Sequence, residues 1–148
     1  MKYLIIASYP ASILKFRGAL IKALQDKGFE IHVAAPEFEV YPEECDSLIA
    51  LGYTVHDIPM QRTGTNPLKD AKTLSALYLL MKKVKPDYVL GYTIKPVIYG
   101  SLAAKLARVP HIFALITGLG YAFSGAEEKG YKKSNLQKVM HQLYAAAL

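Results

Sequence analysis

Cationic, hydroxyl-bearing and glycine residues follow four of the short apolar runs in this chain. Guanidinium and ammonium groups bind phosphate, and hydroxyls and the backbone amides at glycine complete its hydrogen bonds. This combination predicts a site for an anionic ligand that carries phosphate. The candidate binding residues are Ser8, Tyr9, Arg17, Arg62, Thr93, Lys95, Thr117, Gly118 and Gly120.

For two of these residues, position in the chain indicates a more specific chemistry. Arg17 lies near the start of a predicted helix, where a guanidinium can hold a phosphate bidentately beside the helix N-terminus. Lys95 precedes Pro96 directly after an apolar run, so its ammonium can pair with a phosphate or with a developing negative charge. The alternative for both residues is an ordinary solvated side chain at a turn.

The elements that must position these residues alternate between strand and helix. Continuous apolar runs predict strands at residues 3–7, 30–35, 54–60, 88–92 and 111–117. Apolar residues at helical spacing predict a helix that Ser12 caps and Gly28 ends. They predict others at 42–51, at 67–84 with Asn66 as its cap, around 99–107 and from 136 to the end. This order is typical of a Rossmann-like, doubly wound parallel sheet of at least five strands, in a single domain over residues 1–148. Such sheets bind ligands at the carboxyl ends of their strands, where the candidate binding residues lie.

The glycine motifs of the chain fit neither of the common nucleotide fingerprints. Phe123 stands where a dinucleotide-binding motif needs glycine, and such a motif would follow the first strand rather than the fifth. The segment that starts at Gly125 approximates a P-loop, but Tyr131 occupies the place of its lysine. The four histidines and the single Cys45 lack metal-ligand spacing, so no metal site is predicted. The sequence does not identify the catalytic residues.

Length, composition and charge limit the class of protein. The 148 residues are 52% hydrophobic and 20% charged, which excludes a disordered chain, and a single cysteine excludes a disulfide-stapled scaffold. The formal net charge of +6 is unevenly spread, because residues 1–57 hold 5 basic and 8 acidic residues whereas 58–148 hold 13 and 4. This asymmetry predicts a surface that meets an anionic partner. Without a signal peptide or an apolar stretch near the ~18 residues of a membrane span, we expect an intracellular protein whose membrane contact is peripheral.

Aromatic residues and lysines alternate between the fifth predicted strand and the last helix. Together they suit a membrane interface or a polyprenyl phosphate, and the alternative is a solvated loop. The residues predicted to contact a membrane or lipid carrier are Tyr121, Phe123, Lys129, Tyr131, Lys132 and Lys133.

Several motifs, in a fixed order, resemble those of a known enzyme family. They are Phe16-Arg17, Arg62-x-Gly64-x-Asn66-Pro67-x-x-Asp70, Lys85-Pro86-Asp87, Tyr92-Thr93-Ile94-Lys95-Pro96-x-x-Tyr99-Gly100-Ser101-Leu102-Ala103-Ala104 and Ile116-Thr117-Gly118-Leu119-Gly120-Tyr121-Ala122-Phe123. Over nearly its full length, the chain resembles the N-terminal domain of family 4 glycosyltransferases, which are retaining enzymes of the GT-B fold. The resemblance is greatest to those that build capsular and O-antigen polysaccharide on a lipid carrier.

The resemblance implies a two-domain enzyme whose N-terminal half binds the acceptor, an undecaprenyl-diphosphate-linked saccharide. A C-terminal domain, absent from this chain, would bind the nucleotide-sugar donor, and transfer would need neither metal nor another cofactor. The expected partners are therefore that donor domain, the lipid-linked acceptor and an anionic membrane surface, but no nucleic acid. The expected location is cytoplasmic, peripheral to the inner face of the cell membrane, and this part alone is expected to be inactive.

Two other hypotheses remain open from the sequence. The chain is a non-catalytic subunit that recruits the acceptor or the membrane in a split glycosyltransferase, or it is an unrelated Rossmann module that binds a nucleotide or a flavin. The failed glycine fingerprints count against the second of these hypotheses.

Overall fold

Strands and helices alternate in the computed structural model, which describes residues 1–64, 66–117 and 135–148. This order confirms the elements predicted from the sequence. The third and fifth strands end earlier than predicted, at Asp57 and Leu115. After Asp57 the ladder cannot continue because Pro59 has no amide hydrogen. The elements are β1 (Lys2–Ile6), α1 (Ala11–Asp26), β2 (Glu30–Ala35), α2 (Pro42–Ala50), β3 (Thr54–Asp57), α3 (Pro67–Val84), β4 (Tyr88–Tyr92), α4 (Ile94–Ala107), β5 (His111–Leu115) and α6 (Asn135–Ala147).

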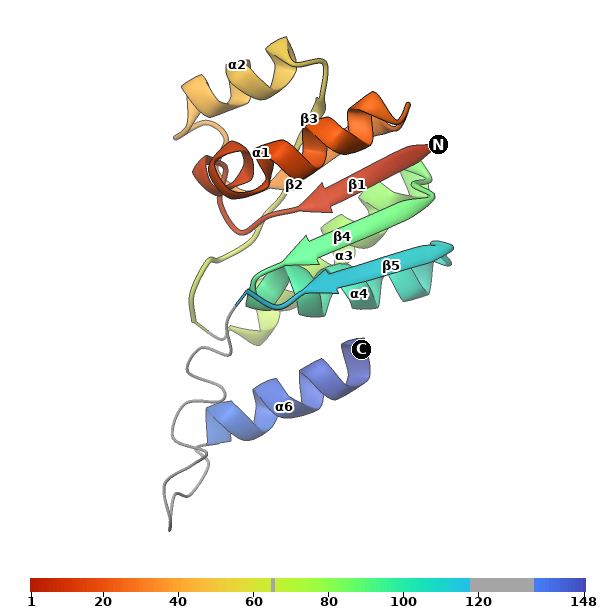
Figure 1. Ribbon diagram of the computed structural model, residues 1–148. Coiled ribbons are helices and arrows are strands. Elements are labelled where there is room, and N and C mark those ends of the chain that lie inside the picture. Colours follow the sequence, from red (N-terminus) through yellow and green to blue (C-terminus); the bar gives the residue numbers. More distant parts are fainter. Residues whose placement is uncertain (65, 118–134) are drawn as a thin grey trace.

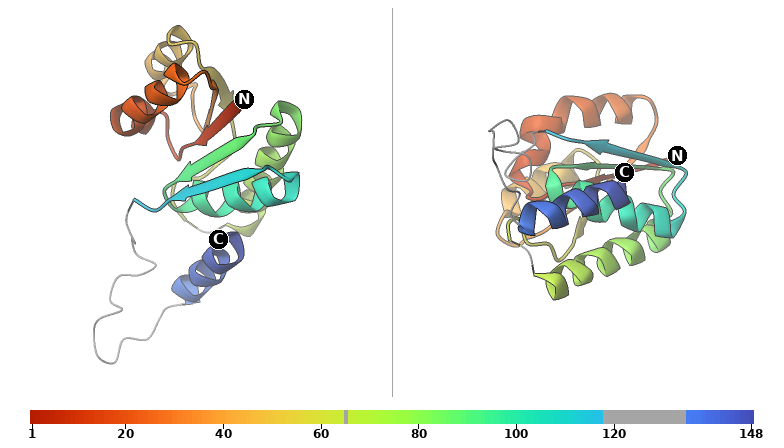
Figure 2. Two further views of the ribbon diagram at one scale, coloured as in Figure 1. Left: turned by 45° about the vertical axis from the view of Figure 1, so that its right-hand side comes forward. Right: turned by 90° about the horizontal axis from the view of Figure 1, so that it is seen from below.

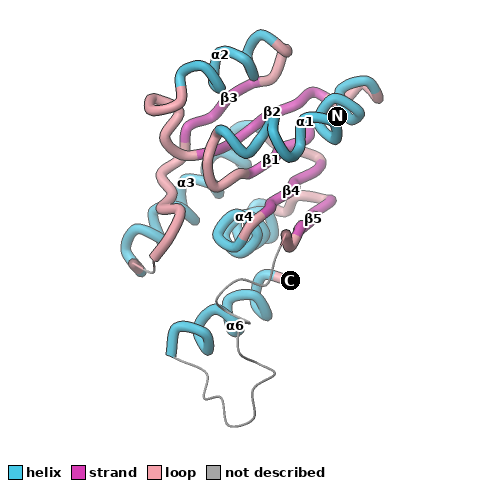
Figure 3. The backbone as a smooth tube through the Cα atoms, turned by 60° about the vertical axis from the view of Figure 1, so that its left-hand side comes forward, coloured by secondary structure: helices cyan, strands magenta, loops and turns pink. Residues whose placement is uncertain are grey.

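The five strands form one parallel sheet in the order β3-β2-β1-β4-β5. The chain runs outward from β1 to β3 and then crosses to β4 on the other side of β1, which is the doubly wound arrangement (Figure 1). All carboxyl ends therefore lie along one edge of the sheet, where the loops that follow them begin (Figure 3). The winding reverses between β1 and β4. The loop after β1 therefore goes to one face of the sheet and the loop after β4 goes to the other, which leaves a crevice between them.

Helices cover both faces of the sheet. One core packs α1 and α2 against residues such as Ile5 and Val33, and the other packs α3, α4 and α6 against residues such as Leu4 and Ile6. Successive strand residues point to opposite faces, so a strand covered on both sides must be apolar, as β1 is from Tyr3 to Ile6. The last helix, α6, packs beside α4 (Figure 2).

The starts of the helices depend on local chemistry. The side chain of Asn66 caps α3 as predicted, because its oxygen accepts hydrogen bonds from the amides of Leu68 and Lys69 at 3.2 and 3.3 Å. The prediction that Ser12 caps α1 is wrong, since the helix begins at Ala11 and Ser12 lies inside it. Its hydroxyl instead makes the contacts with neighbouring residues described below.

The junction of β4 and α4 is the tightest turn at the edge that carries the candidate residues. Thr93 alone separates the strand from the helix. A Cβ atom added to Gly91 would lie 2.5 Å from the backbone oxygen of Pro96, and one added to Gly100 would lie 2.9 Å from Ile6 Cδ1. Gly91 therefore lets the start of α4 pack directly on the backbone of β4, and Gly100 lets the middle of α4 pack against the side chain of Ile6 on β1.

Candidate functional site

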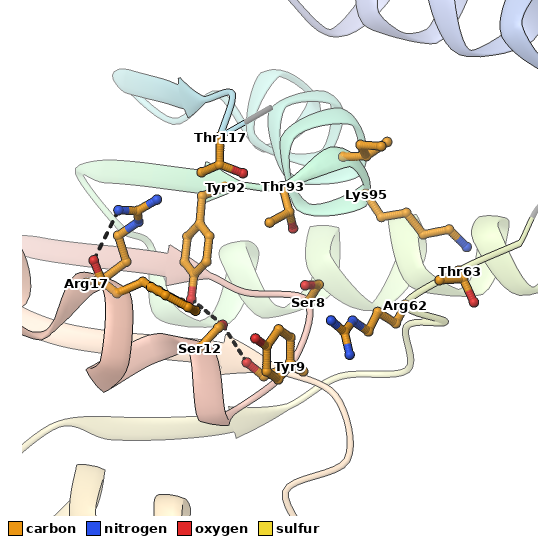
Figure 4. Close-up of a pocket in the computed structure, with 12 residues that line it drawn as sticks. Ser8, Tyr9, Ser12, Arg17, Arg62, Thr63, Tyr92, Thr93, Lys95 and Thr117 are labelled. Carbon is orange, nitrogen blue, oxygen red and sulfur yellow. Dashed lines mark hydrogen bonds between the residues drawn. The ribbon is translucent and has the colours of Figure 1, made fainter. Parts of the chain in front are cut away.

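A cavity of about 470 Å³ opens at the carboxyl ends of β1 and β4, at the crevice where the winding of the sheet reverses (Figure 4). Its walls come from the loops after four strands and from the first turns of α1 and α4. The lining residues are Ser8, Tyr9, Ser12, Phe16, Arg17, Arg62, Thr63, Tyr92, Thr93, Ile94, Lys95 and Thr117.

The structure brings together seven of the residues that the sequence analysis singled out, although their roles in binding remain predictions. These residues are Ser8, Tyr9, Arg17, Arg62, Thr93, Lys95 and Thr117. The other predicted site residues lie outside the described part of the chain: Gly118, Gly120, Tyr121, Phe123, Lys129, Tyr131, Lys132 and Lys133.

The two arginines are held by aromatic rings. The guanidinium carbon of Arg17 lies 5.1 Å from the ring centre of Tyr92, and that of Arg62 lies 4.2 Å from the ring centre of Tyr9. Arg17 also donates from Nη1 to the carbonyl oxygen of Phe16 at 3.1 Å. Within the described residues no carboxylate pairs with either arginine. Stacking orients a guanidinium without neutralising it, so both arginines keep their charge available to a ligand.

Lys95 is held differently, by a buried carboxylate. Its ammonium donates to Asp70 Oδ1 at 2.8 Å, and the two residues are only 7% and 8% exposed. The hydroxyl of Tyr99 also hydrogen-bonds Asp70, and burial together with this bond and the charge of Asp70 raises the pKa of Tyr99 well above its usual range. A single carboxylate on α3 therefore fixes two side chains of α4, including the lysine of the cavity.

Asp70 and Tyr99 are not among the site residues predicted from the sequence. One signal was available, because Asp70 lies on the same face of α3 as the buried Leu77, Met81 and Val84. A carboxylate on the buried face of a helix requires a partner that offsets its loss of solvation. The pattern indicates that a partner exists, but only the packing of α3 against α4 identifies it as Lys95.

Thr93 combines an unusual backbone with an unpartnered hydroxyl. Its φ of 68° places a β-branched residue in the left-handed region, which costs about 1–3 kcal/mol. Its Oγ1 is buried and, like the buried Nε of Arg17, has no hydrogen-bond partner among the described residues. The first amides of α4, those of Ile94 and Lys95, have no acceptor within the helix. The floor of the cavity is thus rich in donors.

Tyr92 and Ser12 form one fixed wall. The hydroxyl of Ser12 donates to the carbonyl oxygen of Tyr9 at 2.8 Å, so the hydrogen bond of 2.8 Å between Tyr92 and Ser12 is donated by the phenol. Tyr92 is 2% exposed, and burial raises its pKa above the usual range. Tyr92 is therefore a neutral, rigid support for the guanidinium of Arg17.

Other titratable clusters lie elsewhere in the described residues. His32 and His56, on β2 and β3, share a hydrogen bond of 3.0 Å, and His32 also contacts Glu30 at 2.8 Å. Burial is the main cause that lowers the pKa of His56. None of the three lines the cavity, and the described residues contain no group of three or more possible metal ligands.

The cavity lining is suited to binding an anion. It offers two arginines, one lysine and several hydroxyls, and none of the described lining residues is a carboxylate, histidine or cysteine. No helix in the described part of the chain is both long and apolar enough to span a membrane.

Comparison with known proteins places these features in context. Residues 8–147 match a protein family described as "Glycosyl transferase 4-like". The chain is 33% identical over 134 residues to the N,N'-diacetylbacillosaminyl-diphospho-undecaprenol alpha-1,3-N-acetylgalactosaminyltransferase of Campylobacter jejuni, a match that covers 90% of this chain and 34% of that enzyme. It is 29% identical over 109 residues to the UDP-Gal:alpha-D-GlcNAc-diphosphoundecaprenol alpha-1,3-galactosyltransferase of Escherichia coli, covering 74% of this chain and 27% of that enzyme. The chain thus spans about a third of the length of these relatives.

Solved structures confirm the fold. A UDP-N-acetylglucosamine 2-epimerase matches with a TM-score of 0.67 at 18% identity, over 99% of this chain and 40% of that one. MurG of Acinetobacter baumannii matches with a TM-score of 0.58 at 23% identity, over 76% of this chain and 34% of that one. At these identities the likeness establishes the Rossmann-like architecture alone.

Proposed function

The chain belongs to the glycosyl transferase 4-like family, and we propose that it is the acceptor-binding part of an enzyme of surface-polysaccharide synthesis. The enzyme would transfer a sugar from a nucleotide-sugar, with retention of configuration, to a saccharide linked to undecaprenyl diphosphate. Family membership excludes the hypothesis of an unrelated nucleotide- or flavin-binding module.

One observation carries this proposal. The names of both curated relatives specify an acceptor on diphospho-undecaprenol, although one transfers N-acetylgalactosamine and the other galactose. What the two names share is the lipid diphosphate, and what they do not share is the donor sugar. We therefore assign the segment, which matches about a third of each enzyme, to the common acceptor rather than to the donor.

The cavity supports the same assignment. A lipid-linked saccharide presents an anionic diphosphate between a sugar and an apolar chain, and the cavity presents Arg17, Arg62 and Lys95 to an anion. The cations and hydroxyls among the described lining residues fit a part of the enzyme that binds the acceptor. Donor binding and turnover would then need a second domain, supplied by the same polypeptide or by a separate subunit.

The proposed acceptor also sets the location. A saccharide on undecaprenyl diphosphate stays in the membrane, so the chain would work peripherally at the inner face of the cell membrane, where nucleotide-sugars are available. The excess of basic residues in 58–148 would favour an anionic lipid surface.

A matched pair of ligands tests the proposal. Farnesyl-diphosphate-linked N-acetylglucosamine and UDP-N-acetylglucosamine share their sugar and diphosphate and differ in the group at the other end. Isothermal titration of the purified chain is expected to show at least about tenfold tighter binding of the farnesyl compound, because the uridine has no partner in an acceptor site. Tighter binding of UDP-N-acetylglucosamine would assign the cavity to the donor and refute the proposal.

A further inference from the structure

Two histidines outside the cavity share a hydrogen bond between the two outer strands β2 and β3. Nδ1 of His32, on β2, lies 3.0 Å from Nε2 of His56, on β3, and the two rings are nearly parallel, at 12°. His32 is 6% exposed, and its other nitrogen, Nε2, lies 2.8 Å from Glu30 Oε1. Because both ring nitrogens of His32 are engaged, its protonation is tied to that of its two neighbours.

The hydrogens of this chain have one arrangement when both histidines are neutral. The hydrogen bond from His32 lowers the pKa of Glu30, so the carboxylate is ionised and accepts the hydrogen that His32 Nε2 carries. In a neutral ring the other nitrogen, Nδ1, is then an acceptor, and the bond of 3.0 Å must be donated by His56 Nε2. Each histidine therefore donates once, in the direction of Glu30.

The pair has room for one extra proton but not for two. A protonated His32 still donates to Glu30, and it can donate to His56 if His56 carries its own hydrogen on Nδ1. A second proton would place hydrogens on both nitrogens of the 3.0 Å bond and bring two positive charges together. In an unfolded chain the two histidines take up both protons independently, so only the folded state opposes the second one.

The surroundings of the pair oppose this proton as well. Burial, the other histidine and then Lys83 on α3 lower the pKa of His56. Lys2 and the N-terminal amine act on Glu30, the one carboxylate within ion-pair distance of either histidine in the described residues. Asp57 follows His56, but strand alternation turns its side chain to the opposite face of the sheet.

The strand that carries His56 is also the less secured of the two. β3 is an edge strand, and its four residues pair with β2 alone. The hydrogen bond between His32 and His56 is therefore a side-chain addition to a short ladder. The segment that follows β3 brings Arg62 and Thr63 to the cavity, so whatever holds β3 on β2 also holds the start of that segment.

From these observations we propose that His32 and His56 form a proton-sensitive link between β2 and β3, intact near neutral pH and broken by double protonation below about pH 6. The inference does not rest on the proposed function, because neither histidine lines the cavity. The sign follows from proton counts: histidines released from the link take up protons near pH 6.5, whereas the link refuses the second one until the pH is lower. The pairing of β3 is thus most stable above pH 6.5 and weakens as the pH falls below it.

Amide hydrogen exchange of the purified chain tests the link. Protection factors, corrected for the intrinsic effect of pH, are compared for the amides of β3 and of β4, an interior strand without histidine. We expect the protection of β3 relative to β4 to be about tenfold lower at about pH 5.5 than at about pH 7.5, the effect of one linked proton. Titration of the ring protons of His32 and His56 by NMR should show two steps at least about one pH unit apart.

A matched pair of variants assigns the effect to the link. His56→Gln keeps an amide that can donate to His32 but takes up no proton, so the relative protection of β3 should change by less than about twofold between the two pH values. His111→Gln removes an exposed histidine from the opposite edge strand and should keep the full change. If His56→Gln fails to fold, His56→Val replaces it, because valine favours a strand and does not titrate.

Several results would overturn the link. They are equal relative protection of β3 at the two pH values, a loss that is as large in β4 as in β3, a loss that persists in the folded His56 variant, and a single titration step near pH 6.5 shared by both histidines. Each of these results would leave the proposed function untouched, since that proposal is tested by the choice between two ligands of the cavity.

Discussion

At the scale of single residues, Asp70 determines how Lys95 can act. A buried ammonium is stable only beside a negative charge, and the carboxylate of Asp70 lies 2.8 Å from Lys95 Nζ with both residues buried. Lys95 is therefore a positioned cation, unlike Arg17 and Arg62, which rest on rings. The cavity thus combines one neutralised and two unneutralised cations.

Removal of this carboxylate is expected to destabilise the fold. Asp70→Asn leaves the Lys95 ammonium buried without an opposite charge, which should lower the free energy of unfolding by about 3 kcal/mol or more. The double variant Asp70→Asn with Lys95→Met removes both charges and should recover much of that loss. Urea denaturation measures all three free energies. A single variant within about 1 kcal/mol of the unmodified chain would show that the pair does not matter to the fold.

At the scale of elements, the site depends on how closely α4 approaches β4. Gly91 lies opposite the carbonyl of Pro96, and the single residue Thr93 turns the chain from strand to helix. This junction holds both Thr93 and Lys95 at the cavity. The geometry of the site is thus set by the backbone as much as by the side chains that line it.

Two glycine variants test that dependence. Gly91→Ala would place a Cβ atom 2.5 Å from a backbone oxygen, so we expect a loss of about 2 kcal/mol or more and weaker binding of farnesyl-diphosphate-linked N-acetylglucosamine as the start of α4 shifts. Gly18→Ala in α1 is the control, since its nearest neighbour would lie at 4.0 Å and alanine favours a helix interior by about 0.5–1 kcal/mol. Unfolding free energies that fall equally in both variants would contradict this account of the junction.

The sequence predicts the elements well because their signals are local. Apolar runs and helical spacing identify the strands and helices, and Asn66 and Gly28 mark helix ends because capping acts within a few residues. The prediction of a helix cap fails where the hydrogen bonds of a side chain depend on a residue that is distant in the sequence. Ser12 would cap a helix by local rules, but Tyr92, eighty positions away, takes part of its hydrogen bonding.

The difference between general rules and partners that are distant in the sequence also explains how much of the site is predictable. The rule that ligands bind at carboxyl strand ends is topological, so it brings together Arg17, Arg62, Lys95 and their neighbours without any knowledge of packing. The partners that tune these residues come from other elements: the rings of Tyr92 and Tyr9, and Asp70 on α3. Which residues those are depends on tertiary packing, to which no local pattern corresponds.

At the scale of the whole molecule, the uneven spread of charge and the family membership both fit the binding of an anionic substrate. Residues 58–148 carry most of the positive charge, and they supply Arg62 and Lys95 to the cavity while the more acidic first part supplies Arg17. The chain matches about a third of each curated relative, and under the proposed function donor binding would come from outside the described residues.

Sugar transfer by a chimeric enzyme tests the central claim most directly. The chain replaces the matched 134-residue segment of the Campylobacter jejuni enzyme, and transfer from that enzyme's own N-acetylgalactosamine donor is measured on a panel of prenyl-diphosphate-linked saccharides. If this chain binds the acceptor, the chimera should keep its donor and change its preferred acceptor, and Arg62→Gln should raise the KM for the acceptor by about tenfold with less effect on the KM for the donor. A folded, active chimera that retains the parent's acceptor preference would contradict the account.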